Sequence, residues 1–143
     1  MNQSHLNADA SAQTPPSGGA SNLYEEDETA WLEETARLTA ERRFDELDHE
    51  HLSQFLLDMA RRDKREVLSR LTTLLLRLLK WEHQPDQRSK SWQATLAVQR
   101  QELHDLLESQ TLRNHAQEVL AKAYERAVRL AALETGLAVE SFA

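Results

Sequence analysis

The residues best suited to bind a ligand or partner lie close together in the sequence, between Lys80 and Trp92. This stretch combines two tryptophans, a histidine and several hydrogen-bond donors around one predicted loop. Loops held by rigid helices commonly carry binding groups, so the segment is the best candidate for a functional surface. This candidate binding surface consists of Lys80, Trp81, His83, Gln84, Arg88, Ser89, Trp92 and Arg100.

A structural role is the alternative for the same segment. Trp81 and Trp92 can close the end of a helical bundle as large apolar side chains. Ser89 or Ser91 can cap the following helix through its hydroxyl oxygen. We favour this structural interpretation of the segment.

A predicted break between two helices is flanked by four cationic residues: Arg61, Arg62, Lys64 and Arg65. They form a candidate nucleic-acid patch in a short arrangement like a helix-turn-helix. A recognition helix should expose a polar face, however, and the helix after this break is apolar on most sides. We therefore favour a solvated helix start with i,i+4 pairs such as Arg62 with Glu66.

Motifs for metal binding and catalysis are missing from the sequence. The histidines are isolated or two residues apart, so neither an HExxH nor an ExxH pairing occurs and no metal site is expected. No Gly-x-Ser-x-Gly turn and no glycine-rich phosphate loop is present among the three glycines. No catalytic residue and no cofactor are predicted. An enzyme with a site near Lys80, His83 and Arg88 is the least favoured hypothesis.

Composition narrows the compartment and the partners. The 143 residues include no cysteine, which excludes disulfides and thiolate metal sites and favours a reducing cytoplasm. No segment suits a signal peptide or a membrane span, so a cytoplasmic location without membrane contact is predicted. The net charge of −7 is uneven, because residues 61–90 hold 9 basic and 4 acidic groups. Charged and apolar positions alternate there, as is typical of a solvated helix face.

The elements that must position these residues are helices, because Leu, Ala, Glu and Arg are abundant. Residues 1–22 are polar and are predicted to be a disordered tail, and residues 139–143 a short C-terminal tail. One all-α bundle is predicted over residues 23–138. Its five helices are expected at about residues 28–42, 49–61, 63–83, from about 90, and 112–135.

The helix ends and the bundle centre follow from local patterns. Asp27, Asp48 and Thr111 are predicted to cap helix starts, and Gly136 to end the last helix. The reciprocal capping pattern of Asp63 with Glu66 predicts a helix start there. The third helix is expected at the bundle centre, because its apolar residues spread beyond one stripe. The fifth helix carries an alanine-rich stripe that can approach a neighbour closely: Ala116, Leu120, Ala123, Tyr124, Ala127 and Ala131.

Several short motifs follow one another in a recognisable order: Leu78 to Trp81, Gln84-Pro85, Arg88-Ser89, Ser91-Trp92, Gln99-Arg100, Ala123-Tyr124 and Glu134 to Leu137. In this order they resemble the domain-of-unknown-function 29 family of bacterial and cyanobacterial proteins. The resemblance covers about residues 23–137 and implies an all-helical fold without an established activity. The family often has an acidic pair near Gln54 and Phe55 and a histidine at Arg77. Any site built from those family residues would lack its ligands here.

These observations together predict a non-enzymatic helical module that binds another protein, or a second copy of itself, through an apolar or alanine-rich helix face. The alternative is a nucleic-acid-binding regulator that uses the basic segment of residues 61–90. Nucleic acid is the less favoured partner, because the basic residues fit a solvated helix face.

Overall fold

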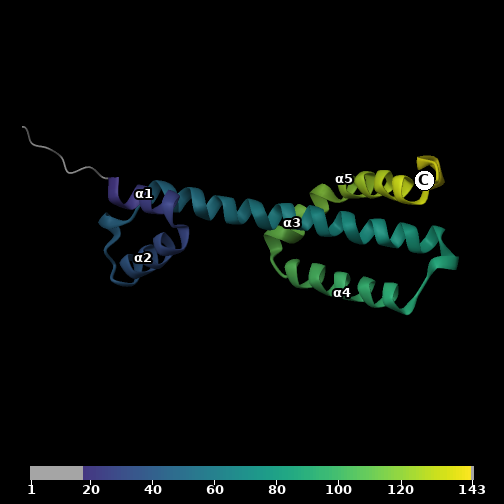
Figure 1. The fold of residues 1–143 in the computed structure, drawn as a ribbon, viewed down its shortest axis with the longest axis horizontal. Coiled ribbons are helices and arrows are strands. Elements are labelled where there is room, and N and C mark those ends of the chain that lie inside the picture. The colour runs from purple at the N-terminus through teal and green to yellow at the C-terminus, as the bar shows by residue number, and fades with distance from the viewer. Residues whose placement is uncertain (1–17, 143) are drawn as a thin grey trace, which may run out of the picture. The chain divides into compact units, whose positions relative to one another are not determined.

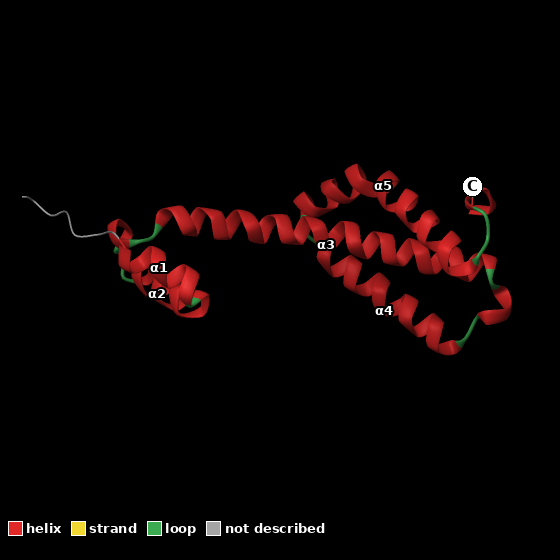
Figure 2. Cartoon of the chain, turned by 45° about the horizontal axis from the view of Figure 1, so that its top comes forward, coloured by secondary structure: helices red, strands yellow, loops and turns green. Residues whose placement is uncertain are grey.

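The computed structural model describes residues 18–142, and every regular element among them is helical (Figure 2). The α-helices in this range are α1 (Gly18–Glu26), α2 (Glu28–Ala40), α3 (His49–His83), α4 (Lys90–Leu106) and α5 (Gln110–Thr135). Three 3-10 helices, η1 (Phe44–Glu46), η2 (Pro85–Gln87) and η3 (Val139–Phe142), complete the order. The all-α prediction is confirmed.

The predicted tail of residues 1–22 falls in two parts. Residues 1–17 lie outside the described residues, whereas residues 18–22 belong to helix α1, which the sequence analysis did not predict. At its other end the chain forms η3 where a tail over residues 139–143 was expected, and Phe142 in η3 is buried. Within residues 18–142, no helix has the length and apolar character needed to cross a membrane.

The chain divides into two compact units, Met1–Leu56 and Leu57–Ala143, which are described separately. Helix α3 begins in the first unit and ends in the second. The prediction of one bundle over residues 23–138 does not anticipate this division.

The first unit is organised around Trp31, which is 1% exposed. Its indole Nε1 donates a hydrogen bond to Asp48 Oδ2 at 3.3 Å, so the polar end of the buried ring is satisfied. Its ring lies edge-on to Tyr24 at 4.8 Å and tilted against Phe55 at 5.7 Å. Tyr24 also stacks on His51 at 4.4 Å. These contacts give α1 a tertiary reason to be helical that its polar composition does not reveal.

The predicted break in front of Asp63 is wrong, because α3 runs without interruption from His49 to His83. Residues 59–65 contain no glycine or proline, and most are good helix formers. The side chains of this stretch are exposed, so nothing in it requires the helix to end. The spacing of Asp63 and Glu66 suits a capping box, but it suits the interior of an exposed helix equally well.

The second unit is built around α3, with α4 along one side and α5 along the other (Figure 1). The prediction of a central third helix is confirmed. One core cluster joins all three helices through Val67, Leu71, Leu74, Leu96, Leu103, Leu112, Ala116 and Ala123. A second cluster joins the ends of α3 and α5 to η3 through Leu79, Ala127, Val128, Ala131 and Phe142.

Small residues allow α5 to approach α3 closely. Ala123, Ala127 and Ala131 are fully buried, as the predicted alanine stripe requires. Leu120 and Tyr124, which belong to the same predicted stripe, are 49% and 41% exposed. The stripe is therefore narrower than the sequence pattern suggests.

Most predicted helix ends are found in the structure. Asp27 accepts a hydrogen bond from Ala30 N at 3.0 Å, and Asp48 accepts one from His51 N at 3.3 Å. Gly136 ends α5 at φ 73°, a conformation that glycine adopts without steric cost. The cap of α5 is an exception, because Ser109 rather than Thr111 accepts the hydrogen bond from Leu112 N at 3.3 Å.

Candidate functional site

Trp81 and Trp92 meet where α3 ends and α4 begins. Their ring centroids lie 5.5 Å apart with the planes at 85°, the edge-to-face arrangement that aromatic pairs favour. Both side chains are partly buried and pack against the core cluster that joins α3, α4 and α5. The hydroxyl oxygen of Ser89 accepts a hydrogen bond from Trp92 N at 3.1 Å and caps α4. The structural role that the sequence analysis favoured for these three residues is realised.

Each ring of this aromatic pair has a cation nearby. The guanidinium of Arg88 lies 5.0 Å from the Trp81 ring, and its Nε donates a hydrogen bond to the Trp81 carbonyl at 2.8 Å. Lys80 Nζ lies 5.9 Å from the Trp92 ring and 2.9 Å from Glu134 Oε2. Arg88 thereby satisfies one of the carbonyls left free at the C-terminal end of α3.

The other members of the candidate binding surface lie apart from this pair. The His83 ring packs edge-on against Phe142 of η3 at 4.6 Å. The buried Oε1 of Gln84 has no hydrogen-bond partner among the described residues. Arg100 is exposed further along α4 and lines none of the cavities described below. The structure thus brings together Lys80, Trp81, Arg88, Ser89 and Trp92 and does not add Arg100 to them.

A polar cavity of about 420 Å³ lies beside the start of α4. Lys80, Ser89 and Trp92 of the candidate binding surface line it, together with Arg77 from α3 and Glu134 from α5. Glu134 already pairs with Lys80, so the cavity carries one balanced ion pair. Arg77 makes no ion pair within the described part of the chain.

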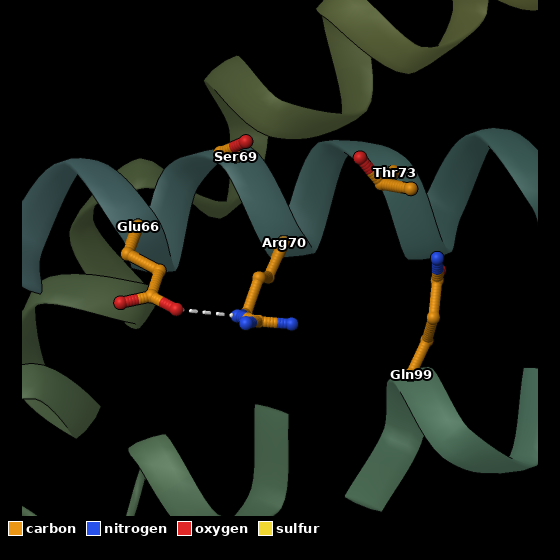
Figure 3. A pocket seen from close by; sticks show the side chains of 5 residues that line it. All are labelled: Glu66, Ser69, Arg70, Thr73 and Gln99. Carbon is orange, nitrogen blue, oxygen red and sulfur yellow. Dashed lines mark hydrogen bonds and ion pairs between the residues drawn. The ribbon is translucent and has the colours of Figure 1, made fainter. Parts of the chain in front are cut away.

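A second polar cleft of about 260 Å³ lies between α3 and α4, lined by Glu66, Ser69, Arg70, Thr73 and Gln99 (Figure 3). Arg70 Nε donates to Glu66 Oε1 at 2.8 Å, and Arg70 also pairs with Glu102 of α4. These hydrogen bonds from Arg70 to Glu66 and Glu102 raise the pKa of the guanidinium above its ordinary value. Glu66 and Arg70 therefore pair within α3, and Arg70 also joins α3 to α4 through Glu102.

A groove of about 640 Å³ lies between α3 and α5. We call it the α3/α5 groove. Apolar surface dominates its lining, which includes Leu68 and Leu130. Thr72 is buried, and its hydroxyl donates to the Leu68 carbonyl at 2.7 Å, so it adds little free polarity. The full lining is Arg65, Leu68, Ser69, Thr72, Thr73, Arg126, Arg129 and Leu130.

Sequence reasoning missed the contribution of α5 to this groove. Arg126, Arg129 and Leu130 were not singled out, because one leucine beside two arginines resembles an ordinary solvated face. Their i, i+3, i+4 spacing was the available signal, since it places all three on one side of a helix. Leu133, which continues this side, is 80% exposed.

The candidate nucleic-acid patch lies on the exposed stretch of α3 rather than around a turn. Arg61 pairs with Asp58 at 3.4 Å. Arg62 and Lys64 are exposed without an ion pair among residues 18–142, and the expected pair of Arg62 with Glu66 does not form because Glu66 binds Arg70. The helix-turn-helix-like arrangement is wrong, since no turn separates the helices. Only Arg65 of the four residues lines the α3/α5 groove.

No group of three histidine, aspartate or glutamate side chains in the described range lies close enough together to hold a metal ion. No histidine lines the polar cavity, the polar cleft or the α3/α5 groove. The hydroxyls of Ser89 and Thr72 serve the helices themselves.

The fold and these cavities define an all-helical protein with open grooves between its helices. Residues 23–143 match the model of the domain of unknown function DUF29, which covers most of the chain. The protein belongs to the DUF29 family. Comparison with curated proteins and with solved structures finds no match.

Proposed function

We propose that this protein is a non-enzymatic helical module that binds another protein chain through the outer side of α5 and the adjoining α3/α5 groove. The observation that carries the proposal is the apolar groove of about 640 Å³ beside large exposed apolar side chains. Leu130 is 40% exposed in the groove, and Leu133, one turn further along α5, is 80% exposed. Exposed apolar surface of this kind marks places where partners bind.

A pair of aspartate substitutions tests this proposal. Leu130→Asp with Leu133→Asp places two charges on the proposed surface without touching the buried core. Native mass spectrometry of untagged protein from its own host should show a partner chain, or a second copy, with the wild type. The double variant should lose that chain at unchanged helix content by circular dichroism.

The matched control is Leu120→Asp, because Leu120 is 49% exposed on the same helix but does not line the groove. This variant should keep the partner. A wild-type protein that is strictly monomeric by light scattering and carries no other chain would overturn the proposal.

The second candidate function is binding to nucleic acid through the basic segment of residues 61–90. Its support is that Arg62, Lys64 and Arg65 are exposed without ion pairs in the part of the chain that the structure describes. Affinity for duplex DNA would then fall steeply with salt, and the slope would shrink when Arg61, Arg62, Lys64 and Arg65 become alanine. Equal affinity and slope for wild type and the fourfold variant would remove this candidate.

The cytoplasmic location predicted from the sequence belongs to the same proposal. A protein partner within the cytoplasm is consistent with a chain that has no cysteine. Fractionation of host cells, with detection of the untagged protein by antibody, tests the location directly. Recovery in the periplasmic or membrane fraction would contradict it.

A further inference from the structure

We propose that the α3/α5 groove binds an acidic amphipathic helix of a partner protein. The apolar side chains of that helix would pack on the floor of the groove, and its carboxylates would pair with the arginines of the groove. This inference rests on the proposed function and names the chemistry of the partner. It concerns residues of the second unit only.

The charge of the groove has one sign. Arg65 of α3 and Arg126 and Arg129 of α5 line it, and none of its lining residues is acidic. Arg129 pairs with Glu125, whereas Arg65 and Arg126 make no ion pair within residues 18–142. All three are exposed, so their guanidiniums can turn toward a bound carboxylate. Guanidinium binds carboxylate through two parallel hydrogen bonds, which suits recognition of glutamate or aspartate.

The floor of the groove is apolar, which selects a protein helix over a charged polymer. Leu68 and Leu130 are the two leucines that line it, and the Thr72 hydroxyl is already bound to the Leu68 carbonyl. Ser69 and Thr73 line both the groove and the polar cleft, whereas Glu66 and Arg70, drawn in Figure 3, line the polar cleft and not the groove. A nucleic-acid backbone would use the arginines but leave the apolar floor uncovered.

The length of the groove suits about two turns of helix. On α3 its lining runs from Arg65 to Thr73, which at 1.5 Å per residue is roughly 12 Å. A helix laid in a groove uses anchors at i, i+3 or i+4, and i+7, which cover the same distance. Leucines at those positions would reach the floor while glutamates on both sides of them meet the arginines.

The test uses the full-length protein and a pair of designed helical peptides. Both peptides carry leucines at i, i+3 and i+7; one has glutamates at the flanking positions and the other has lysines there. Fluorescence anisotropy of the labelled peptides should show that the glutamate peptide binds, and that the lysine peptide binds on the order of tenfold more weakly or not at all. Added salt should weaken binding of the glutamate peptide.

Three variants locate the binding. Charge reversal by Arg65→Glu, Arg126→Glu and Arg129→Glu together should invert the preference, so that the lysine peptide binds better. Leu130→Asp should weaken binding of the glutamate peptide, because it removes apolar floor and adds a negative charge. Arg100→Glu reverses an exposed arginine of α4 outside the groove and should change nothing. Circular dichroism of each variant should match the wild type.

Failure of this inference is distinguishable from failure of the proposed function. Equal binding of the two peptides, or no binding of either, overturns the acidic-helix inference. The proposed function survives that result if the host partner is still lost from the Leu130→Asp, Leu133→Asp variant. Nucleic acid replaces an acidic helix as the ligand if duplex DNA displaces the glutamate peptide and if Leu130→Asp leaves the affinity for DNA unchanged. That result overturns the inference. A wild-type dimer by light scattering that dissociates in the Leu130→Asp variant overturns it in favour of a second copy.

Discussion

Arg88 illustrates how one exposed side chain can fix the end of a long helix. It donates to the Trp81 carbonyl at 2.8 Å and lies 5.0 Å from the ring of the same residue. A hydrogen bond of this kind contributes about 1 kcal/mol, and an exposed cation–π contact about 0.5–1 kcal/mol. We therefore expect Arg88→Ala to lower the free energy of unfolding by about 1–2 kcal/mol. Urea unfolding followed by circular dichroism measures it.

Arg100 provides the control for that prediction. It is an exposed arginine of α4 outside the cavities of the second unit, so Arg100→Ala should change stability by less than about 0.5 kcal/mol. If Arg88→Ala and Arg100→Ala lower the free energy of unfolding equally, the loss of a positive charge explains the effect of Arg88. The hydrogen bond to the Trp81 carbonyl and the contact with its ring would then not be the cause.

The role of a single residue could be predicted from the sequence where that role depends on its near neighbours in the chain. Asp27, Ser89 and Gly136 act where the sequence placed them, because a cap depends only on the few residues that follow or precede it. Thr111 failed because Ser109, two residues earlier, offers the same hydroxyl chemistry. Tyr24 could not be placed from sequence, since its role depends on Trp31 and His51 in other elements.

The continuity of α3 is a property of the element, and proline tests it. If a helix began after Asp63 as cap, proline at Lys64 would occupy the first helical position, where it is tolerated. Inside an unbroken helix the same proline removes a hydrogen bond and clashes with the preceding turn, at a cost of about 3 kcal/mol. We expect Lys64→Pro to lower the free energy of unfolding by about that amount in urea.

Lys90→Pro is the matched control, because Lys90 is the first residue of α4 behind its cap Ser89. Proline there meets no preceding turn, and the variant should retain nearly all of the wild-type stability. A Lys64→Pro variant as stable as Lys90→Pro would mean that α3 is broken in solution.

The α3/α5 groove shows what periodicity cannot supply at this scale. The buried faces of α3 and α5 could be predicted from the sequence, because apolar residues recur at helical spacing in each helix. Val67 and Leu71 in α3 and Ala127 in α5 are examples. The groove arises from two faces that are each unremarkable alone. Arg126 and Leu130 of α5 form a groove only together with Leu68 of α3. Tertiary packing decides which helix faces meet, and the sequence pattern of one helix does not reveal it.

An arginine–glutamate network in the first unit makes a pH prediction. Hydrogen bonds from Arg37 lower the pKa of Glu34, and hydrogen bonds from Arg43 lower the pKa of Glu41 and Glu46. A lowered folded-state pKa stabilises the protein above the ordinary value of 4.5, and this contribution disappears as the pH falls through the lowered pKa. The difference in Tm between wild type and Arg43→Gln should therefore be largest near neutral pH and shrink below about pH 4.

The control for this prediction is Arg42→Gln, since Arg42 makes no ion pair in the described part of the chain. Its Tm difference from wild type should stay nearly constant with pH. All of these groups are exposed, so the effect of Arg43 should be small and should shrink further in high salt. Parallel pH profiles for the two variants would show that the network does not stabilise the fold.

At the scale of the whole molecule, the two units differ in net charge. Residues 1–56 hold 12 acidic and 3 basic groups, whereas residues 57–143 hold 12 acidic and 14 basic ones. The first unit therefore carries a net charge of −9 and the second +2, and the groove lies in the second. The overall pI of 5.4 would have argued against an acidic partner, and only the division into units removes that objection.

The second unit holds its own core, which leads to a prediction about its independence. Every buried member of both core clusters lies between Val67 and Phe142. A chain of residues 57–143 should therefore be helical by circular dichroism and unfold cooperatively in urea. Within it, Leu71→Ala should cost about 2–5 kcal/mol because Leu71 is buried, whereas Leu133→Ala should cost less than about 0.5 kcal/mol at 80% exposure. A broad, non-cooperative transition would show that the second unit requires the first in order to fold.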